Sequence, residues 1–256
     1  MREILEAVAA GELTPAEAES ELAGYATTGA GRFDAAREAR SGVPEAVLGT
    51  GKTTGELADL ATTAVETTGR AIVTRIDAAG AGAVRRALDE SAPGTTVRWD
   101  ERARWLVATA PEFERPAIDA AVGVVTAGTS DAVPAGEAAM IAREMGVDVR
   151  RIDDAGVASL ARTVDAADRL RDQDVLVVAA GREGALPTVV AGLVDTPVVG
   201  LPVSTGYGHG GGGEAALSGM LQSCTALSVV NIDAGFTAGV QAGLIARRVA
   251  AARAGK

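Results

Sequence analysis

The chain has 256 residues, 47% of them hydrophobic and 23% charged, which is typical of a folded globular protein and too apolar for a disordered one. Its formal net charge of −10 argues against a protein that binds nucleic acid through a basic surface. The single cysteine and the single histidine exclude an internal disulfide and a zinc site built from several such ligands. Without a long apolar segment for a membrane span or a secretory signal, a cytoplasmic protein is expected.

Residues 1–110 are predicted to form a small α/β domain behind a helical leader. Two short helices are expected within residues 1–24, where Thr14 suits an N-cap and Pro15 the first helical turn. The two prolines and three charges of PEFERPA indicate a linker. The further predicted elements are a strand over 71–77, a helix over 78–90, a hairpin over 95–110 with its turn near Asp100 and Glu101, and the linker at 111–117.

Residues 118–256 show a regular alternation of apolar runs and helical segments. The runs are continuous rather than alternating, which predicts strands buried on both faces of a parallel sheet that helices cover. Right-handed crossovers then give a doubly wound α/β domain. The predicted strands are 121–128, 147–152, 174–181, 196–203 and 227–233, and the predicted helices are 134–145, 157–170, 183–193, 214–223 and 235–251.

Polar residues follow four of the five predicted strands. Ligands of an open parallel sheet bind at the carboxyl ends of the strands, so these residues are candidates for one site. The same residue types also serve ordinary turns and helix caps, and this reading applies to each loop taken alone. The candidates are Thr129, Ser130 and Asp131 after the first strand, Arg182 and Glu183 after the third, Ser204 to Gly213 after the fourth, and Asn231 and Asp233 after the fifth.

The sharpest local feature is GYGHGGGGEAAL, in which four glycines lead directly into a helix. Glycines let backbone N–H groups approach an anion, and a helix N-terminus favours one. This pattern predicts contact with a phosphate or a nucleotide. The alternative is that the loop is a flexible lid. His209 either binds a phosphate or is an exposed loop residue without a role in binding.

Other candidates also have a structural reading. A lone cysteine such as Cys224 is commonly a small buried hydrophobe rather than a nucleophile. Asp131 and Asp233 suit helix caps as well as acid–base or metal chemistry. Lys52, the one lysine before the last residue of an arginine-rich chain, is either a phosphate-binding arm or a surface charge.

Two long stretches resemble the LarB family, the carboxylase/hydrolases of nickel-pincer nucleotide cofactor biosynthesis. They are AGTSDAVPAGEAA and GREGALPTVVAGLVDTPVVGLPVSTGYGHGGGGEAALSGMLQSCTALSVVNIDAGF, and FDAAREARSGVPEAVLGTGKT resembles that family's N-terminal motif. The similarity covers residues 33–240. The C-terminal half is also similar to the AIR carboxylase of purine synthesis, which has a G-x-x-SD loop after its first strand.

The resemblance implies that the substrate is nicotinic acid adenine dinucleotide, with CO2 or bicarbonate as co-substrate. The family carboxylates C5 of the pyridinium ring and cleaves the phosphoanhydride, giving pyridinium-3,5-biscarboxylic acid mononucleotide and AMP. A pyridinium ring is too electron-poor to attack CO2, whereas addition of a thiolate at C6 leaves an enamine that is nucleophilic at C5. The resemblance also implies a homo-oligomer, an octamer in the family, and Mg2+ is plausible for the pyrophosphate.

Roles for individual residues follow from the matched motifs. The family's cysteine motif matches Cys224, which would be the nucleophile, and Ser130 and Asp131 match the SD loop. Glu183 and Asp233 are candidates for proton transfer. The expected substrate contacts are Thr129, Arg182, Ser204, Gly206, Tyr207, Gly208, His209, Gly210, Gly211, Gly212, Gly213, Asn231 and Lys52, and no metal ligand is assigned.

The sequence departs from the family at two places. Ala161 and Arg162 stand where the family usually has a His-Arg pair, and NIDAGF replaces the more frequent NIDNGF. The missing histidine argues against the first alternative, an aminoimidazole ribonucleotide carboxylase or mutase. The second alternative is a dinucleotide-binding module without turnover, since such sheets host many functions.

Overall fold

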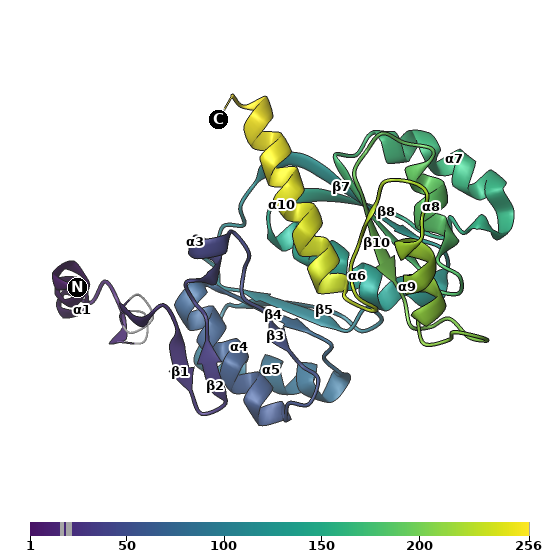
Figure 1. Ribbon diagram of the computed structural model, residues 1–256. Helices are drawn as coiled ribbons and strands as arrows, with labels where there is room; N and C mark the ends of the chain where they lie inside the picture. Colours follow the sequence, from purple (N-terminus) through teal and green to yellow (C-terminus); the bar gives the residue numbers. More distant parts are fainter. Residues whose placement is uncertain (16–17, 19–21, 256) are drawn as a thin grey trace. The chain divides into compact units, whose positions relative to one another are not determined.

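The computed structural model describes residues 1–15, 18 and 22–255, and Figure 1 shows its helices and strands. The chain divides into two compact units, Met1–Glu114 and Arg115–Lys256. The division falls within the segment 111–117. Among the described residues, no helix has the length and apolar character needed to cross a membrane.

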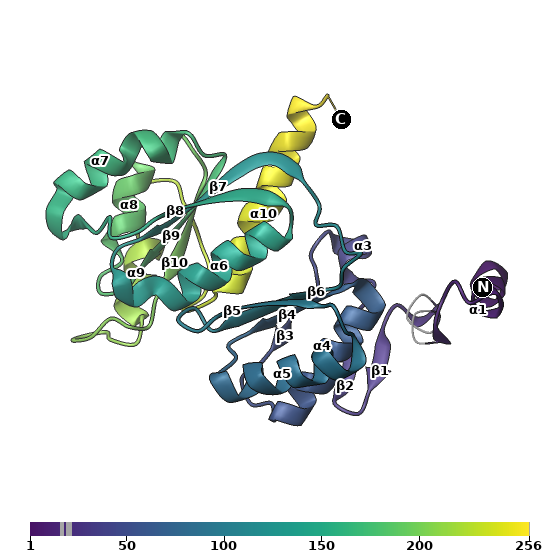
Figure 2. The same cartoon turned by 180° about the vertical axis from the view of Figure 1, so that it is seen from behind.

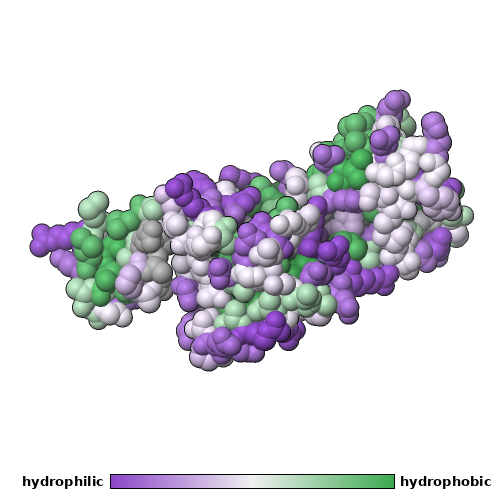
Figure 3. Space-filling model, turned by 90° about the horizontal axis from the view of Figure 1, so that it is seen from below, coloured by the Kyte–Doolittle hydropathy of each residue, from purple (hydrophilic) through white to green (hydrophobic). Residues whose placement is uncertain are grey.

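The first unit begins with helix α1 (Arg2–Ala10), which ends at Gly11 in the left-handed conformation. The helix exposes apolar surface, seen at the left of Figure 3, and Leu5 is among its exposed side chains. The second helix expected before residue 24 falls largely on 16–17 and 19–21, outside the described residues. Strands β1 (Ala26–Thr28) and β2 (Gly31–Phe33) form an antiparallel hairpin, and a short helix α3 (Arg37–Ser41) follows.

A four-stranded sheet with helices on one face makes up the rest of this unit. Alternate residues of the central strands, such as Ala71 and Val73, share a core with Leu57 and Val84 of two helices, and Figure 1 shows both helices under the sheet. The strand at 71–77, the helix at 78–90 and the hairpin at 95–110 are confirmed. The elements are β3 (Val47–Leu48), α4 (Thr54–Thr68), β4 (Arg70–Thr74), α5 (Ala78–Ser91), β5 (Thr96–Asp100) and β6 (Trp105–Thr109), in sheet order β3-β4-β6-β5.

Helix α4 was not predicted, although the sequence carries a signal for it. The hydroxyl of Thr53 accepts the backbone N–H of Glu56, and the Glu56 carboxylate accepts the backbone N–H of Thr53 at 2.7 Å. This reciprocal capping box is a known start signal for a helix. The many alanines and threonines of α4 weaken the helical periodicity of its apolar residues. The capping box is therefore the clearest sequence signal for this helix.

The second unit is built on a parallel sheet of five strands. The sheet order β11-β10-β9-β7-β8, with every pair parallel, confirms the doubly wound α/β prediction. The strands are β7 (Ile118–Thr126), β8 (Val147–Ile152), β9 (Val175–Ala180), β10 (Val198–Pro202) and β11 (Ser228–Val229). The helices are α6 (Ala132–Glu144), α7 (Leu160–Arg171), α8 (Ala185–Ala191), α9 (Glu214–Leu221) and α10 (Gly235–Arg253), with 3₁₀ turns η1 (Thr129–Asp131) and η2 (Val157–Ser159).

Both faces of the sheet are covered. Helices α6 and α10 pack on one face and helices α7, α8 and α9 on the other, as Figures 1 and 2 show. The expectation of continuous burial is met by β9 and β10 but is wrong for β8, in which the exposed Asp148 and Arg150 alternate with the buried Val147 and Val149. The reason is position, because β8 is an edge strand.

The glycines of α10 serve contacts within the chain. A Cβ atom on Gly235 would lie 2.1 Å from the carbonyl oxygen of Pro134, and one on Gly239 would lie 2.4 Å from that of Ala138. The small-residue face of α10 therefore packs closely against α6 of the same chain.

Candidate active site

The sheet order places a ligand crevice between β7 and β9. The chain leaves β7 toward β8 on one side and leaves β9 toward β10 on the other, so the loops diverge at this point. Such a topological switch point is where open parallel sheets bind their ligands. A cavity of about 570 Å³ lies there, and its walls come from the loops after β7, β8, β9 and β10.

Six of the expected site residues line this cavity. They are drawn from three strand ends that are far apart in the sequence, as a site at one sheet edge requires. The six are Ser130, Asp131, Arg182, Glu183, Gly206 and Tyr207. Thr129 belongs to the same 3₁₀ turn as Ser130 and Asp131.

Asp131 is the buried acid of the cavity. It is 2% exposed, its carboxylate accepts the backbone N–H of Gly128 at 2.9 Å, and the Ser130 hydroxyl lies 3.4 Å from its other oxygen. Burial raises the pKa of Asp131 above its ordinary value, against the lowering effect of these donors. A carboxyl group with a raised pKa in a cavity wall is suited to accept and return a proton.

Arg182 and Tyr207 meet at the cavity from neighbouring strand ends. The guanidinium carbon of Arg182 lies 4.2 Å from the centroid of the Tyr207 ring. Arg182 has a φ of 49°, in the left-handed region, and Glu183 is exposed beside it. These groups give the cavity a cation, an aromatic face and a second carboxylate.

The glycine-rich loop contributes less to the cavity than its sequence suggested. The N–H groups of Gly211 and Gly212 bond to the carbonyls of Gly208 and Gly206, so these two donors serve turns within the loop. Of the glycines from 206 to 213 only Gly206 lines the cavity. The rest of the loop lies between the cavity-lining residues and the start of α9. It comprises Gly208, His209, Gly210, Gly211, Gly212 and Gly213.

Asp233 ties two strand ends together. Its carboxylate accepts the backbone N–H of Ser204 at 2.9 Å, and its own N–H bonds to the carbonyl of Pro202. It has a φ of 54°. Asp233 therefore anchors the first residue of the glycine-rich loop, while the Asn231 carboxamide accepts the N–H of the adjacent Ile232.

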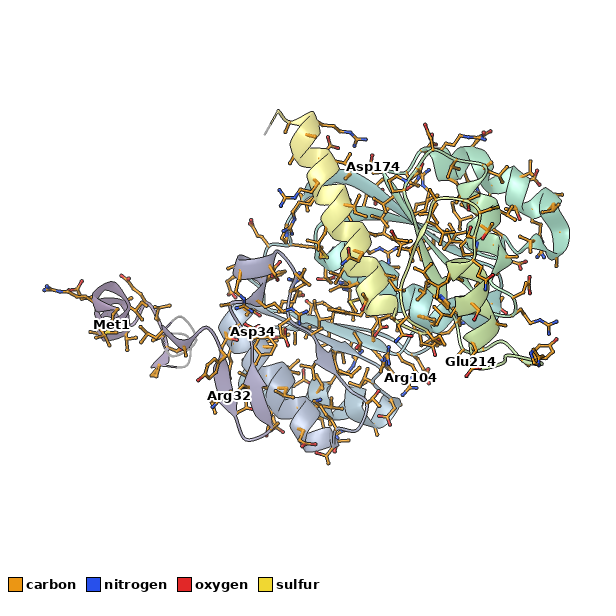
Figure 4. The ribbon with its side chains drawn as sticks, in the orientation of Figure 1. Met1, Arg32, Asp34, Arg104, Asp174 and Glu214 are labelled. Atoms are coloured by element: carbon orange, nitrogen blue, oxygen red, sulfur yellow. The ribbon has the colours of Figure 1, made fainter. Side chains whose placement is uncertain are left out.

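Cys224 lies at the opposite edge of the sheet from the cavity. Helix α9 starts beyond the carboxyl end of β10 and its eight residues rise about 12 Å back along the sheet. Four residues after Cys224, Ser228 pairs with Val199 near the beginning of β10. Figure 4 labels Glu214 at the start of α9 and Asp174 at the amino edge, and they lie at opposite ends of this unit.

The thiol-bearing turn is held by hydroxyl groups. Thr188 donates to Ser223 at 2.9 Å, and the Ser223 and Thr225 hydroxyls lie 2.8 Å apart. Cys224 between them is free and exposed. A single chain thus presents this thiol outward at the amino edge and does not bring it to its own cavity.

The charged N-terminal motif is largely paired within its own unit. Asp34, labelled in Figure 4, pairs with Arg40 at 2.6 Å, and Arg37 pairs with Glu45 at 2.6 Å. Glu38 pairs with the buried Arg70 at 2.8 Å.

Lys52 belongs to the same unit and takes part in the turn that precedes α4. Its backbone N–H donates to the carbonyl of Gly49 at 3.1 Å. The N-terminus of α4 already carries the Glu56 carboxylate at Thr53. That end of the helix is therefore occupied by a negative group of the chain itself.

Arg162 is a cavity residue that the sequence reasoning did not assign to the site. It lines the cavity from α7 and pairs with Asp154 at 2.8 Å. The signal was available, because Arg162 follows the second strand of the sheet at the same edge as the other candidates.

Comparison with known proteins identifies both units. Residues 25–110 match the family model described as the LarB/PurE-like N-terminal domain, and residues 121–256 match the model described as AIR carboxylase. An uncharacterized protein of Methanocaldococcus jannaschii is 39% identical over 223 residues, which is 84% of each chain. The chain belongs to the LarB family. The LarB-type N-terminal domain and the AIR carboxylase domain indicate a carboxylase-type enzyme, and the resemblance inferred from the sequence is confirmed.

No resident metal site is assigned in this LarB protein. Among residues 1–15, 18 and 22–255, no group of three or more His, Cys, Asp and Glu side chains is placed to hold a metal ion.

Proposed function

We propose that this protein carboxylates C5 of the pyridinium ring of nicotinic acid adenine dinucleotide and hydrolyses its phosphoanhydride, releasing AMP and pyridinium-3,5-biscarboxylic acid mononucleotide. The observation that carries the proposal is the switch-point cavity. It joins a buried acid, Asp131, to the cations Arg182 and Arg162 and to the Tyr207 ring. These groups suit a charged ring with carboxylate and phosphate substituents, on a chain with both LarB domains.

The carboxylation needs a nucleophile that is first added and then lost. A cysteine thiolate adds to C6 of the pyridinium, and the ring nitrogen takes up the electron pair. C5 then attacks CO2, a base removes the proton from C5, and the thiolate leaves as the aromatic ring reforms. One difficult step is divided into several easier ones, and Cys224 is the one thiol that the sequence offers.

A second copy of the chain would supply this thiol. Cys224 is exposed at the amino edge, while the cavity opens at the carboxyl edge. The expected homo-oligomer would bring the amino edge of one copy to the cavity of another.

Proton transfer falls to the carboxylates of the cavity. Burial raises the pKa of Asp131 above its ordinary value, which is the direction that favours a general base, and Glu183 is the second candidate. Asp233 is bound to the N–H of Ser204, so we assign it a positioning role for the glycine-rich loop.

The loop residues and the cations would hold the dinucleotide. Ser204, the glycines up to Gly213 and His209 are near enough in sequence to the cavity wall to contact phosphates. Lys52 stays a candidate phosphate ligand on its charge alone. Mg2+ would enter on the pyrophosphate itself, since this ion is commonly held by substrate phosphates with one or two carboxylates. CO2 or bicarbonate completes the reactants.

The test is product analysis by mass spectrometry with nicotinic acid adenine dinucleotide, bicarbonate and Mg2+. Wild-type protein should yield AMP and the dicarboxylated mononucleotide, and Cys224→Ala should yield no carboxylated product. Absence of product together with saturable binding of the dinucleotide would favour a binding module. Turnover of aminoimidazole ribonucleotide instead would favour the reaction suggested by the match to the AIR carboxylase model.

A mixing experiment tests the shared site. Cys224→Ala and Asp131→Asn chains, each inactive alone, are co-expressed with different tags and purified through both. If one chain's thiol serves another chain's cavity, about a quarter of the sites in an even mixture carry both groups and activity returns. If each site uses its own thiol, the mixed oligomer stays inactive.

A further inference from the structure

Arg182 and Tyr207 both line the cavity, and they stack on each other there. The backbone around them holds this pair in place. A Cβ atom on Gly206 would lie 2.6 Å from the backbone nitrogen of Arg182, so the two loops touch through their backbones. Arg182 is held in the left-handed conformation there, which for a residue with a side chain is uncommon and is kept only where surrounding structure enforces it.

The ring of Tyr207 is open to a ligand. The residue is 77% exposed although it lines the cavity, and the guanidinium of Arg182 stands over its face at 4.2 Å. An aromatic face attracts a cation through the negative charge density above the ring. The structure therefore shows this ring with a cation already in place.

We propose that Tyr207 is a cation–π platform that selects the positively charged form of the substrate's ring, and that Arg182 occupies the platform until the ligand displaces it. The displaced guanidinium then turns to a carboxylate or phosphate of the same ligand. The naming of the ring as a pyridinium rests on the proposed function, whereas the selection itself requires only a cationic aromatic ring with an anionic substituent.

This role predicts a particular kinetic signature. Addition of a thiolate to the ring removes its positive charge, so the attraction to Tyr207 is present in the substrate complex and absent in the adduct. Such an interaction binds substrate without favouring the chemical step. Loss of the ring should raise KM and leave kcat unchanged or higher, which a general weakening of the fold would not do.

The first experiment measures the dissociation constants of oxidised and reduced nicotinic acid adenine dinucleotide by calorimetry. The two differ in ring charge and little in size. All chains measured carry Cys224→Ala, so that no thiolate adds to the oxidised ring, and wild type here refers to position 207. Wild type and Tyr207→Phe should prefer the oxidised form by about 3- to 30-fold, the range expected for a cation on an aromatic face. Tyr207→Leu should lose this preference while it binds the reduced form as before. A preference for the oxidised form in Tyr207→Leu as large as that of wild type, or no preference in wild type, would overturn the proposal.

The second experiment tests the exchange with Arg182→Gln and two small probes, 1-methylnicotinamide and neutral nicotinamide. Without the competing guanidinium, the 1-methylnicotinamide cation should bind the variant at least as tightly as it binds wild type. The dinucleotide, which has carboxylate and phosphate groups, should bind it several-fold more weakly. Weaker binding of both ligands would mean that Arg182 only supports the loop.

The outcomes separate this inference from the proposed function. A preference for cationic rings without any AMP or dicarboxylated product would remove the reaction and keep the platform. Formation of both products by Tyr207→Leu with the KM of wild type would keep the reaction and remove the platform.

Discussion

Two aspartates at opposite edges of the parallel sheet are treated in opposite ways by their surroundings. Asp131, at the carboxyl edge, is buried among neutral donors, and burial raises its pKa. Asp174, at the amino edge, is also penalised by burial, but the Arg253 guanidinium and the Ala121 N–H outweigh that penalty and hold its pKa below the ordinary value.

The difference separates a carboxylate that joins elements of the fold from a carboxylate that lines the cavity. The Asp174 carboxylate joins the start of β9 to the last turn of α10 through Arg253 and to β7 through the N–H of Ala121 at 2.8 Å. The negative charge of Asp174 is thus balanced by the Arg253 guanidinium and by the Ala121 N–H. The charge of Asp131 is instead disfavoured by burial next to a cavity, an environment in which carboxylates that exchange protons are often found.

The largest effect is expected at the carboxyl edge. Asp131→Asn keeps an acceptor for the Gly128 N–H but cannot take up a proton, so turnover should fall by about 10²- to 10⁴-fold. The measurement is steady-state formation of the carboxylated product. Asp174→Asn is the matched control, and a comparable loss of turnover in that variant would contradict the separation of roles.

The difference in stability between Asp131→Asn and wild type should depend on pH. Because the folded pKa is raised, wild type loses stability as pH rises through it, and the neutral amide avoids that loss. The variant should therefore melt at a higher temperature than wild type at pH 7, and the two should converge in acid. Thermal melting at several pH values tests this, and lower stability of the variant at pH 7 would contradict it.

A smaller difference is expected between alanine substitutions of Gly206, at the carboxyl edge, and of Gly192, at the amino edge. Gly206→Ala puts a methyl group 2.6 Å from the Arg182 nitrogen, and the backbone shift should cost about 1–3 kcal/mol of unfolding free energy and weaken dinucleotide binding. At the amino edge, a Cβ atom on Gly192 finds its nearest neighbour at 3.4 Å, so Gly192→Ala should stay within about 0.5 kcal/mol. Urea unfolding measures both, and equal costs would contradict the close contact at the cavity mouth.

The carboxyl edge was more predictable from the sequence than the amino edge. A residue that directly follows an apolar strand must lie at the carboxyl edge, which is why Asp131, Arg182 and Glu183 could be assigned to the cavity. The place of Cys224 depends instead on α9 running back along the sheet before β11. That reversal sets it apart from the cavity, although helix and strand were both predicted.

Other differences arose where local sequence does not fix three-dimensional partners. The glycine run predicted backbone N–H groups that would be available to a ligand. The N–H groups of Gly211 and Gly212 instead donate to carbonyl groups of the same loop. The N-terminal motif is rich in charged residues, yet its Arg37 and Arg40 pair with carboxylates nearby in the chain. The contact of Arg182 with the Tyr207 ring could not be predicted, because the two residues lie on separate loops.

The smallest effect, and the sharpest test of the comparison, is the pH dependence of Asp174→Asn. Because the folded pKa of Asp174 is lowered, its ionised form stabilises the protein at neutral pH, and this contribution is lost as pH falls through that pKa. The variant should be less stable than wild type at pH 7 by about 1 kcal/mol, a modest value because water screens the half-exposed Arg253. It should converge with wild type in acid. Asp131→Asn and Asp174→Asn thus approach wild type from opposite sides, and melting curves that approach it from the same side would show that the two edges do not differ as the structure indicates.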